Sequence, residues 1–306
     1  MTTTGDRRPT SATTVETLDR HRERLLAGVP VTESRLEAGG IPTAVLQGGD
    51  GPTVVLLHGP GESAVNWRWT IPDLAATHRV VAPDLPAHGS TGTGDRPLDA
   101  DRADSWLDEL IRATCQEHPV LVGHVLGGAI AARFAARHPG RIRGLVLVDS
   151  LGLARFRPSP RFALGFLGFQ IRPRESSFER FMDQCAYSLD HLRERLGDDW
   201  TSFVAYNLGM ATSDDAGAEG RLFRKAGIPR IPADELDRID APTALIWGRQ
   251  DRALRLRIAE RARERHGWPL HVIDRAADDP ARDQPEAFLR ALRTELDRSA
   301  APQRDT

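Results

Sequence analysis

Three ionisable residues, His124, Asp251 and Asp278, have side chains of the types that transfer protons. A carboxyl group whose pKa is raised by burial or by a second carboxylate can act as a general base. His124 lies in the stretch GHVLGG, residues 123–128, whose glycines permit a tight turn. The following residue, Val125, can attack nothing. The pattern therefore predicts proton transfer without a nucleophile in this stretch.

Length, charge and cysteine content exclude several classes of protein. The 306 residues can form one sizeable core, or one core with a modest inserted segment. The formal net charge of -2 gives no electrostatic reason to expect a nucleic acid or a membrane surface as a partner. Cys115 and Cys185 make no disulfide framework and no metal-binding spacing. We find no signal peptide and no apolar run of the roughly 20 residues that cross a bilayer. We therefore expect a cytoplasmic protein without a metal or cofactor.

Short apolar runs alternate with longer helical patterns, which predicts an α/β fold with a mainly parallel sheet of about eight strands. The runs TESRLEA and IPTAVLQ, joined through two glycines, predict an antiparallel pair at one edge. Aromatic and arginine-rich helical sequence interrupts the alternation and predicts a lid over the carboxyl edge of the sheet. We predict disordered tails at 1–13 and 298–306. The core is made of 14–151 and 236–297 and begins with a helix over 14–28. A helical lid at 152–235 follows the sixth strand.

Several segments, in family order, resemble those of the α/β-hydrolase superfamily between about residues 32 and 297. VVLLHGPGE resembles the oxyanion loop, and VVAPDLPAHGST resembles the next strand and turn. The elbow with its helix and following strand is resembled by LVGHVLGGAIAARFAARHPGRIRGLVLVD. LIWGRQDRA resembles the acid loop, and DDPARDQPEAFLRAL resembles the histidine loop. The resemblance implies an α/β-hydrolase fold with a serine, histidine and acid triad. It also implies a pocket beside the oxyanion loop, formed by His58, Pro60, Trp67, Val125 and Leu126.

The chain departs from the pattern of that family at three positions. Val125 stands where the elbow would present its serine. Asp278 stands where the last loop would carry the histidine. Pro60 follows His-Gly in the first loop, and proline has no N–H to offer to an oxyanion. Of the triad only Asp251, in the acid position, is retained, so we expect a member without serine-type hydrolysis.

The remaining polar residues have structural as well as functional interpretations. Asp251 could act as an acid or base, or could be a loop carboxylate that caps a helix. His58 and His124 could be structural histidines bonded to the backbone. Asp278 and its neighbour Asp279 would then be a solvated pair, whereas the functional interpretation makes Asp278 a general base.

Three functions follow, and we expect the first. It is a cofactor-free isomerase, epimerase, lyase or cyclase that uses Asp251, His124 and Asp278 on a largely apolar small molecule or a peptide-like ligand. The second is a non-catalytic ligand-binding or partner-binding protein. The third is a hydrolase with an unrecognised nucleophile, Ser150 or Cys185, although helical spacing favours a buried structural thiol at the cysteine. The sequence allows a homodimer.

We expect Val125→Ser alone to add no esterase activity to that of the parent chain. A serine hydroxyl needs an adjacent base, and the base position holds Asp278. Combining Val125→Ser with Asp278→His should give weak activity, and Pro60→Gly should raise it by restoring an oxyanion donor, a loss worth roughly 2.7–4 kcal/mol elsewhere. Turnover of short-chain p-nitrophenyl esters measures this. Substantial gain from Val125→Ser alone would show that another base already serves the elbow.

Overall fold

The structure, a computed structural model, describes residues 11–300, with side chains from residue 17. The disordered tails predicted at 1–13 and 298–306 lie largely outside these residues. Their described parts, 11–13 and 298–300, belong to helices α1 (Ser11–Leu25) and α13 (Pro285–Ala300). The helix predicted over 14–28 thus begins and ends three residues earlier than expected. Within the described residues, no helix is both long and apolar enough to cross a bilayer.

A single sheet of eight strands runs through the protein in the order β1-β2-β4-β3-β5-β6-β7-β8. β1 and β2 pair antiparallel, β2 and β4 pair antiparallel, and the remaining neighbours are parallel. The prediction of a mainly parallel sheet with an antiparallel edge is therefore confirmed. The strands are β1 (Thr32–Ala38), β2 (Ile41–Gly48), β3 (Thr53–Leu57), β4 (Arg79–Pro83), β5 (Val120–His124), β6 (Gly144–Val148), β7 (Thr243–Gly248) and β8 (Leu270–Ile273).

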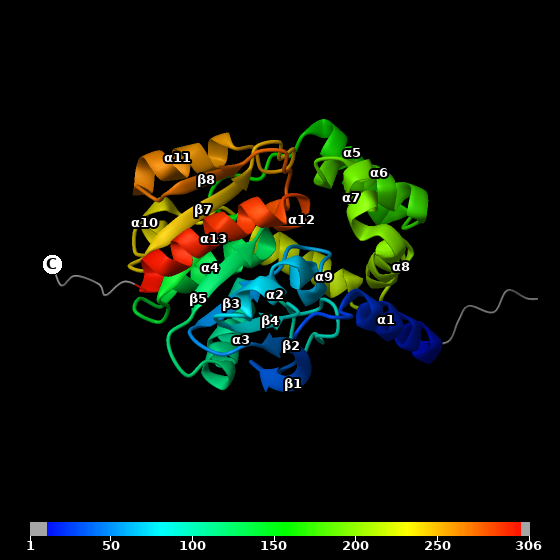
Figure 1. The fold of residues 1–306 in the computed structure, drawn as a ribbon, viewed down its shortest axis with the longest axis horizontal. Coiled ribbons are helices and arrows are strands. Elements are labelled where there is room, and N and C mark those ends of the chain that lie inside the picture. The colour runs from blue at the N-terminus through cyan, green and yellow to red at the C-terminus, as the bar shows by residue number, and fades with distance from the viewer. Residues whose placement is uncertain (1–10, 301–306) are drawn as a thin grey trace, which may run out of the picture.

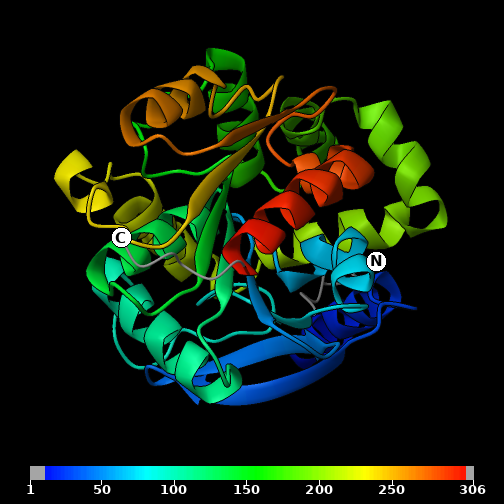
Figure 2. The same cartoon turned by 60° about the vertical axis from the view of Figure 1, so that its left-hand side comes forward.

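Helices cover both faces of the sheet, as continuous apolar strands require. Alternate residues of β3 take opposite sides: Val55 and Leu57 join one hydrophobic cluster, and Val54 and Leu56 join the other. The first cluster includes α3 (Ala100–Thr114), α4 (Leu126–Arg137) and α11 (Arg257–His266). The second includes the 3-10 turn η1 (Ala64–Trp69), α2 (Ile71–Leu74) and α13. Figure 2 shows α13 lying across one face of the sheet.

Only helices and turns connect β6 to β7, over the residues predicted as the lid. Figure 1 shows α5 to α8 standing to one side of the sheet, with α8 beside α1. The segment contains α5 (Pro160–Ile171), α6 (Glu175–Cys185), α7 (Leu189–Leu196), the 3-10 turn η2 (Gly197–Asp199), α8 (Trp200–Ala211), α9 (Ala216–Leu222), the π-helical turn η3 (Phe223–Gly227) and α10 (Ala233–Leu236).

Buried polar contacts fasten this helical segment to α1 and to the core. Arg22 of α1 donates to the hydroxyl of Tyr206 in α8 at 2.9 Å and pairs with the buried Asp84 after β4 at 3.1 Å. Tyr206 donates in turn to Ser63 at 3.2 Å. Because a buried charge is costly unless it is paired, Arg22 fixes the position of α8 over the core.

Val125 occupies the sharp turn between β5 and α4, as the sequence predicts. Its φ of 44° and ψ of -97° are unusual for a residue with a branched Cβ. The glycines around it allow close approach of the backbones. A Cβ on Gly123 would lie 2.6 Å from the Gly127 carbonyl oxygen, and a Cβ on Gly127 would lie 2.3 Å from the Leu57 oxygen. The turn thus depends on glycine at positions where α4 touches the sheet.

Gly127→Ala should lower the free energy of unfolding by roughly 1–3 kcal/mol or more, because the new methyl meets backbone that cannot move away. Gly217→Ala in α9 is the matched control, since nothing lies within 4 Å of its Cβ position. This control should gain about 0.5–1 kcal/mol from helix propensity. Urea unfolding measures both. Equal stability of the two variants would contradict the close packing of the elbow.

Candidate functional site

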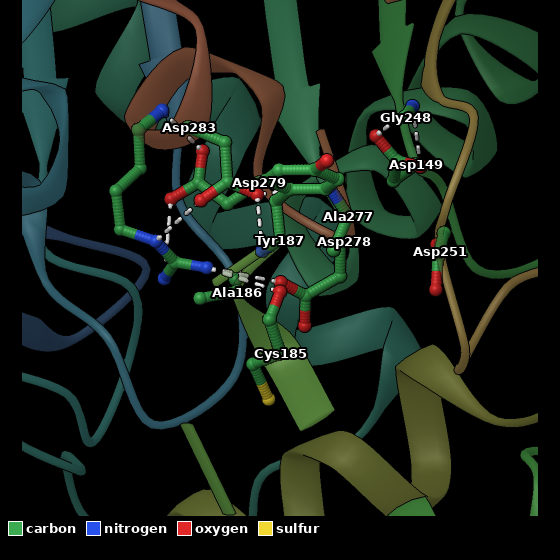
Figure 3. Close-up of polar contacts among 12 residues, drawn as sticks. Asp149, Cys185, Ala186, Tyr187, Gly248, Asp251, Ala277, Asp278, Asp279 and Asp283 are labelled. Carbon is green, nitrogen blue, oxygen red and sulfur yellow. Dashed lines mark hydrogen bonds and ion pairs between the residues drawn. The ribbon is translucent and has the colours of Figure 1, made fainter. Parts of the chain in front are cut away.

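The carboxyl ends of four neighbouring parallel strands gather the ionisable side chains of the site. His124 ends β5, Asp149 follows β6, Asp251 follows β7, and Asp278 lies in the loop after β8. Parallel neighbours end at the same edge of a sheet, which is where open α/β sheets bind ligands. The structure therefore brings together the three residues that the sequence nominates for proton transfer, since His124 bonds to the Asp278 backbone. It adds Asp149, which Figure 3 shows with Asp251 and Asp278.

His124 is held between two acceptors. Its Nδ1 donates to the Glu62 carboxylate at 3.1 Å, and its Nε2 donates to the backbone oxygen of Asp278 at 2.7 Å. Burial disfavours charge on this imidazole, but the adjacent Glu62 outweighs burial and raises the pKa to about 10. Burial would also raise the pKa of Glu62, yet His124 lowers it to about 2. The two side chains are an ion pair at neutral pH, and both ring nitrogens are occupied.

Glu62 also caps the loop that the resemblance assigns to the oxyanion. Its Oε2 accepts the N–H of Gly59 at 2.7 Å. With proline at position 60, two successive backbone positions of this loop offer no free N–H to a ligand. One donor remains at the elbow, because Leu126 is the first residue of α4 and its N–H has no acceptor within the helix.

Arg282 organises the loop after β8. It lies in the short helix α12 (Pro280–Asp283), and its Nη2 donates to Asp278 Oδ1 at 3.2 Å and to the Cys185 carbonyl at 3.3 Å. Nη1 lies 3.5 Å from Asp279 Oδ2. Asp279 also caps α12 by accepting the Arg282 N–H at 3.0 Å. The interpretation of the two aspartates as a solvated pair is wrong, because Asp279 is only 4% exposed and both are bound to a buried guanidinium.

Asp278 is partly exposed to solvent, and its pKa lies near neutral pH. Its side chain keeps 16% of its surface exposed, whereas that of Arg282 keeps 3%. Burial raises the pKa of Asp278 to about 8, against the opposing effect of Arg282, and the Asp251 carboxyl raises it further. Near neutral pH this carboxyl can therefore both give and take a proton.

Asp149 and Asp251 form a second pair of acids beneath this loop. Asp251 Oδ1 accepts the N–H groups of Ala253 at 2.6 Å and Leu254 at 2.8 Å, while its Oδ2 is buried without a partner in the described structure. Asp149 accepts the N–H of Gly248 at 3.1 Å. Burial, and next the Asp251 carboxyl, raise the pKa of Asp149 well above its usual range. Burial also raises the pKa of Asp251.

Neither alternative nucleophile is activated. Burial, and next Asp278, raise the pKa of the Cys185 thiol well above its usual value, so the thiolate is disfavoured. The Ser150 hydroxyl is buried and donates to the Leu151 carbonyl at 2.8 Å. Asp278 lies within hydrogen-bonding reach of the Cys185 thiol and disfavours the thiolate, while the Ser150 hydroxyl is bonded to a carbonyl and not to a base.

The remaining residues assigned to the pocket differ in access. His58 is fully buried: its Nδ1 donates to the Gly59 carbonyl and its Nε2 accepts the Leu85 N–H, so the ring is neutral, and burial lowers its pKa to about 4. Trp67 is 3% exposed and packs edge-on against His124. Pro60 and Val125 keep partial exposure, and Leu126 keeps none. The pocket roles of these five residues stay predictions.

Sequence reasoning missed Glu62, Asp149 and Arg282. Arg282 could have been found, because it stands four residues after Asp278 at helical spacing. Glu62 follows Gly59 by three residues in a glycine-rich turn, but nothing in the sequence shows that its carboxylate reaches His124. Among the described residues, no group of three or more His, Cys, Asp or Glu side chains could hold a metal ion.

Comparison with known proteins identifies the relatives of this chain. Residues 52–277 match the family described as alpha/beta hydrolase fold. The chain is 40% identical over 138 residues to a 2-hydroxymuconate semialdehyde hydrolase of Pseudomonas sp. strain CF600, an alignment that spans 44% of each protein. It is 28% identical over 240 residues to a pimeloyl-[acyl-carrier protein] methyl ester esterase of Aeromonas hydrophila, covering 76% of the chain and 90% of that relative.

A solved structure agrees with these relatives. The 2-hydroxy-6-oxo-6-phenylhexa-2,4-dienoate hydrolase from Rhodococcus sp. strain RHA1 superposes with a TM-score of 0.77 at 26% identity, covering 88% of this chain and 99% of that one. The similarity runs through the sheet and its connections, so the predicted α/β-hydrolase fold is confirmed.

The expected non-hydrolytic function is wrong. The relatives are named as hydrolases of dienoates and of a methyl ester, which contradicts an isomerase, epimerase, lyase or cyclase and does not support a non-catalytic binding protein. The error has a physical source, because a missing serine at the elbow does not by itself exclude hydrolysis. Hydrolysis needs only a water molecule and a group that takes its proton.

The imidazole of His124 should titrate near pH 10, and Glu62→Gln should bring its pKa to about 7 or lower, because burial remains when the carboxylate is gone. NMR of histidine-labelled protein measures this. Glu219→Gln is the matched control, since Glu219 faces a different histidine, His88, at 3.8 Å. A wild-type value near the ordinary 6.5 would show that the His124–Glu62 ion pair does not form.

Proposed function

The chain belongs to the alpha/beta hydrolase fold family, and on that premise we propose that it hydrolyses a carbonyl compound with a water molecule, in place of a serine, as the nucleophile. The observation that carries the proposal is the Asp278 carboxyl. It is partly accessible, held by Arg282, and has a pKa of about 8 at the position where the family places its histidine.

The absence of the serine and histidine is part of this proposal. Val125 presents only methyl groups at the elbow, so no acyl-enzyme can form there. Cys185 and Ser150 offer no substitute, since one is held as a thiol and the other is buried and donates to a carbonyl. Water is then the remaining nucleophile, and its activation requires a base at the carboxyl edge of the sheet.

Asp278 performs both proton transfers in this scheme. Its carboxylate takes a proton from water as the water oxygen bonds to the carbonyl carbon. The bond to the leaving alcohol or carbon then breaks, and the Asp278 acid returns the proton to the leaving group. The products are a carboxylic acid and the protonated leaving group, so atoms and charge balance. A pKa near the working pH suits a group with both tasks.

The surroundings of Asp278 support this role. Arg282 donates to one of its oxygens and fixes the side chain, and the ion-paired His124 fixes its backbone carbonyl. At the elbow, the N–H of Leu126 and the positive end of α4 would stabilise the developing oxyanion. The Asp251 carboxyl is buried beside Asp149 and helps to raise the pKa of Asp278.

The substrate class follows from the relatives and from the walls of the elbow. The relatives act on a semialdehyde or dienoate and on a methyl ester, which share a carbonyl carbon that water can attack. Val125 and Pro60, both partly exposed, add apolar surface beside that carbon. We therefore include among the substrates an apolar ester or a ketone flanked by a conjugated chain.

Asp278→Asn should lower kcat/KM by about 10²–10⁴-fold, the usual contribution of a general base. In the wild type, kcat/KM should rise with pH through about 8 and then level, because the carboxylate is the active form. Hydrolysis of 2-hydroxymuconate semialdehyde and of medium-chain methyl esters, followed from low to high pH, measures both effects.

Asp274→Asn is the matched control. Asp274 follows β8 in the same loop but is exposed and pairs with Arg249, so its loss should leave activity unchanged. Wild-type activity in the Asp278→Asn variant, or a burst of product that reports an acyl-enzyme, would overturn the proposal.

A further inference from the structure

Helix α5 carries an apolar face that nothing in the described structure covers. Leu164, Leu167 and Ile171 are 70%, 54% and 68% exposed and are the exposed large hydrophobic residues of the described chain. Their spacing of three and four residues places them on one side of the helix. Phe162 and Phe169, which are buried, lie on the other side and pack into the helical segment. The apolar face is therefore distinct from the side that stabilises the fold.

The segment that contains α5 is rich in arginine. Residues 155–180 contain six arginines and two glutamates, although the whole chain has a net charge of -2. The six are Arg155, Arg157, Arg161, Arg172, Arg174 and Arg180, and none is ion-paired with a carboxylate of the described residues. One of the two glutamates, Glu179, is paired with Arg193 of α7. The excess positive charge of the segment is thus not neutralised within the protein.

The apolar and basic features meet at the end of α5. A hollow of about 290 Å³ between α5 and α6 is lined by Ile171 together with Arg172, Arg174 and Arg180. The backbone of α6 begins at this hollow with its positive end. Figure 1 shows both helices at the outer margin of the molecule, away from the sheet. Exposed apolar side chains with cations beside them suit contact with an anionic lipid surface, where apolar groups enter the headgroup boundary and cations meet phosphates.

We infer that the outer face of α5, with Leu164, Leu167 and Ile171 at its centre, docks onto the surface of an anionic lipid bilayer. The leucines and isoleucine enter the boundary between headgroups and acyl chains, and the arginines bind lipid phosphates. A second copy of the chain is a poorer occupant, because pairing two α5 helices would bring together their arginines at both ends. Because the whole chain is close to neutral, its net charge does not reveal this basic surface.

Flotation with lipid vesicles tests the inference without any substrate. The intact chain should float with vesicles of phosphatidylcholine mixed with phosphatidylglycerol, and at least about tenfold less with phosphatidylcholine alone or at high salt. Leu164→Gln/Leu167→Gln/Ile171→Gln should reduce flotation at least about tenfold, and so should Arg172→Gln/Arg174→Gln/Arg180→Gln. Arg257→Gln/Arg261→Gln/Arg263→Gln on α11 removes the same charge from another exposed helix and should bind like the wild type.

A local reporter separates docking from unfolding. Leu167→Trp changes an exposed position, so it should leave the fold intact, and its fluorescence should shift to the blue with anionic vesicles. No flotation of the wild type, unchanged flotation of the leucine variant, or equal loss in the α11 control would each overturn the inference. So would a concentration-dependent dimer that the leucine variant abolishes in the absence of vesicle binding, because the face would then join two copies.

Discussion

Carboxyl groups that end neighbouring strands cannot all be ionised in one buried site, and this constraint governs the chemistry of the protein. Two cations, the His124 imidazolium and the Arg282 guanidinium, pair with Glu62, Asp278 and Asp279. Removing a charge from water is costly unless it is paired. Burial accordingly raises the pKa of Asp149, Asp251, Asp278 and Asp279, whereas His124 lowers that of Glu62.

The surroundings of each carboxyl determine whether its charged form is favoured. Glu62 takes the imidazolium and loses its proton, whereas Asp149 has another carboxyl as its neighbour and keeps its own. Asp278 lies between these limits, since Arg282 favours its charge while burial and Asp251 oppose it. A carboxyl with such balanced surroundings can exchange a proton near neutral pH, which an isolated surface aspartate cannot do.

The sequence predicts the sheet because a fully buried strand must be apolar throughout and a glycine-rich elbow tolerates no substitute. The resemblance to the family nominates Asp251 and Asp278, and the structure brings them to the edge that holds His124 because parallel strands end together. The sequence cannot predict the ion pair of Glu62 with His124, because that contact joins residues 62 apart and depends on the path of a loop. For the same reason the sequence predicted that Asp278 and Asp279 are solvated. In the structure both are buried against Arg282, four residues after Asp278.

In the proposed scheme, Val125 at the elbow and Asp278 in the last loop are physically linked. A serine at position 125 would need a neutral base near it, but a histidine at position 278 would stand beside Arg282, and a guanidinium disfavours the imidazolium that must form in serine catalysis. An aspartate is favoured by the same guanidinium. The charges around Arg282 thus support the proposal of a carboxylate that activates water in place of a serine and histidine pair. Val125 then needs only to fill the turn, and its strain of about 1–3 kcal/mol is tolerated because α4 and the glycines over-determine the elbow.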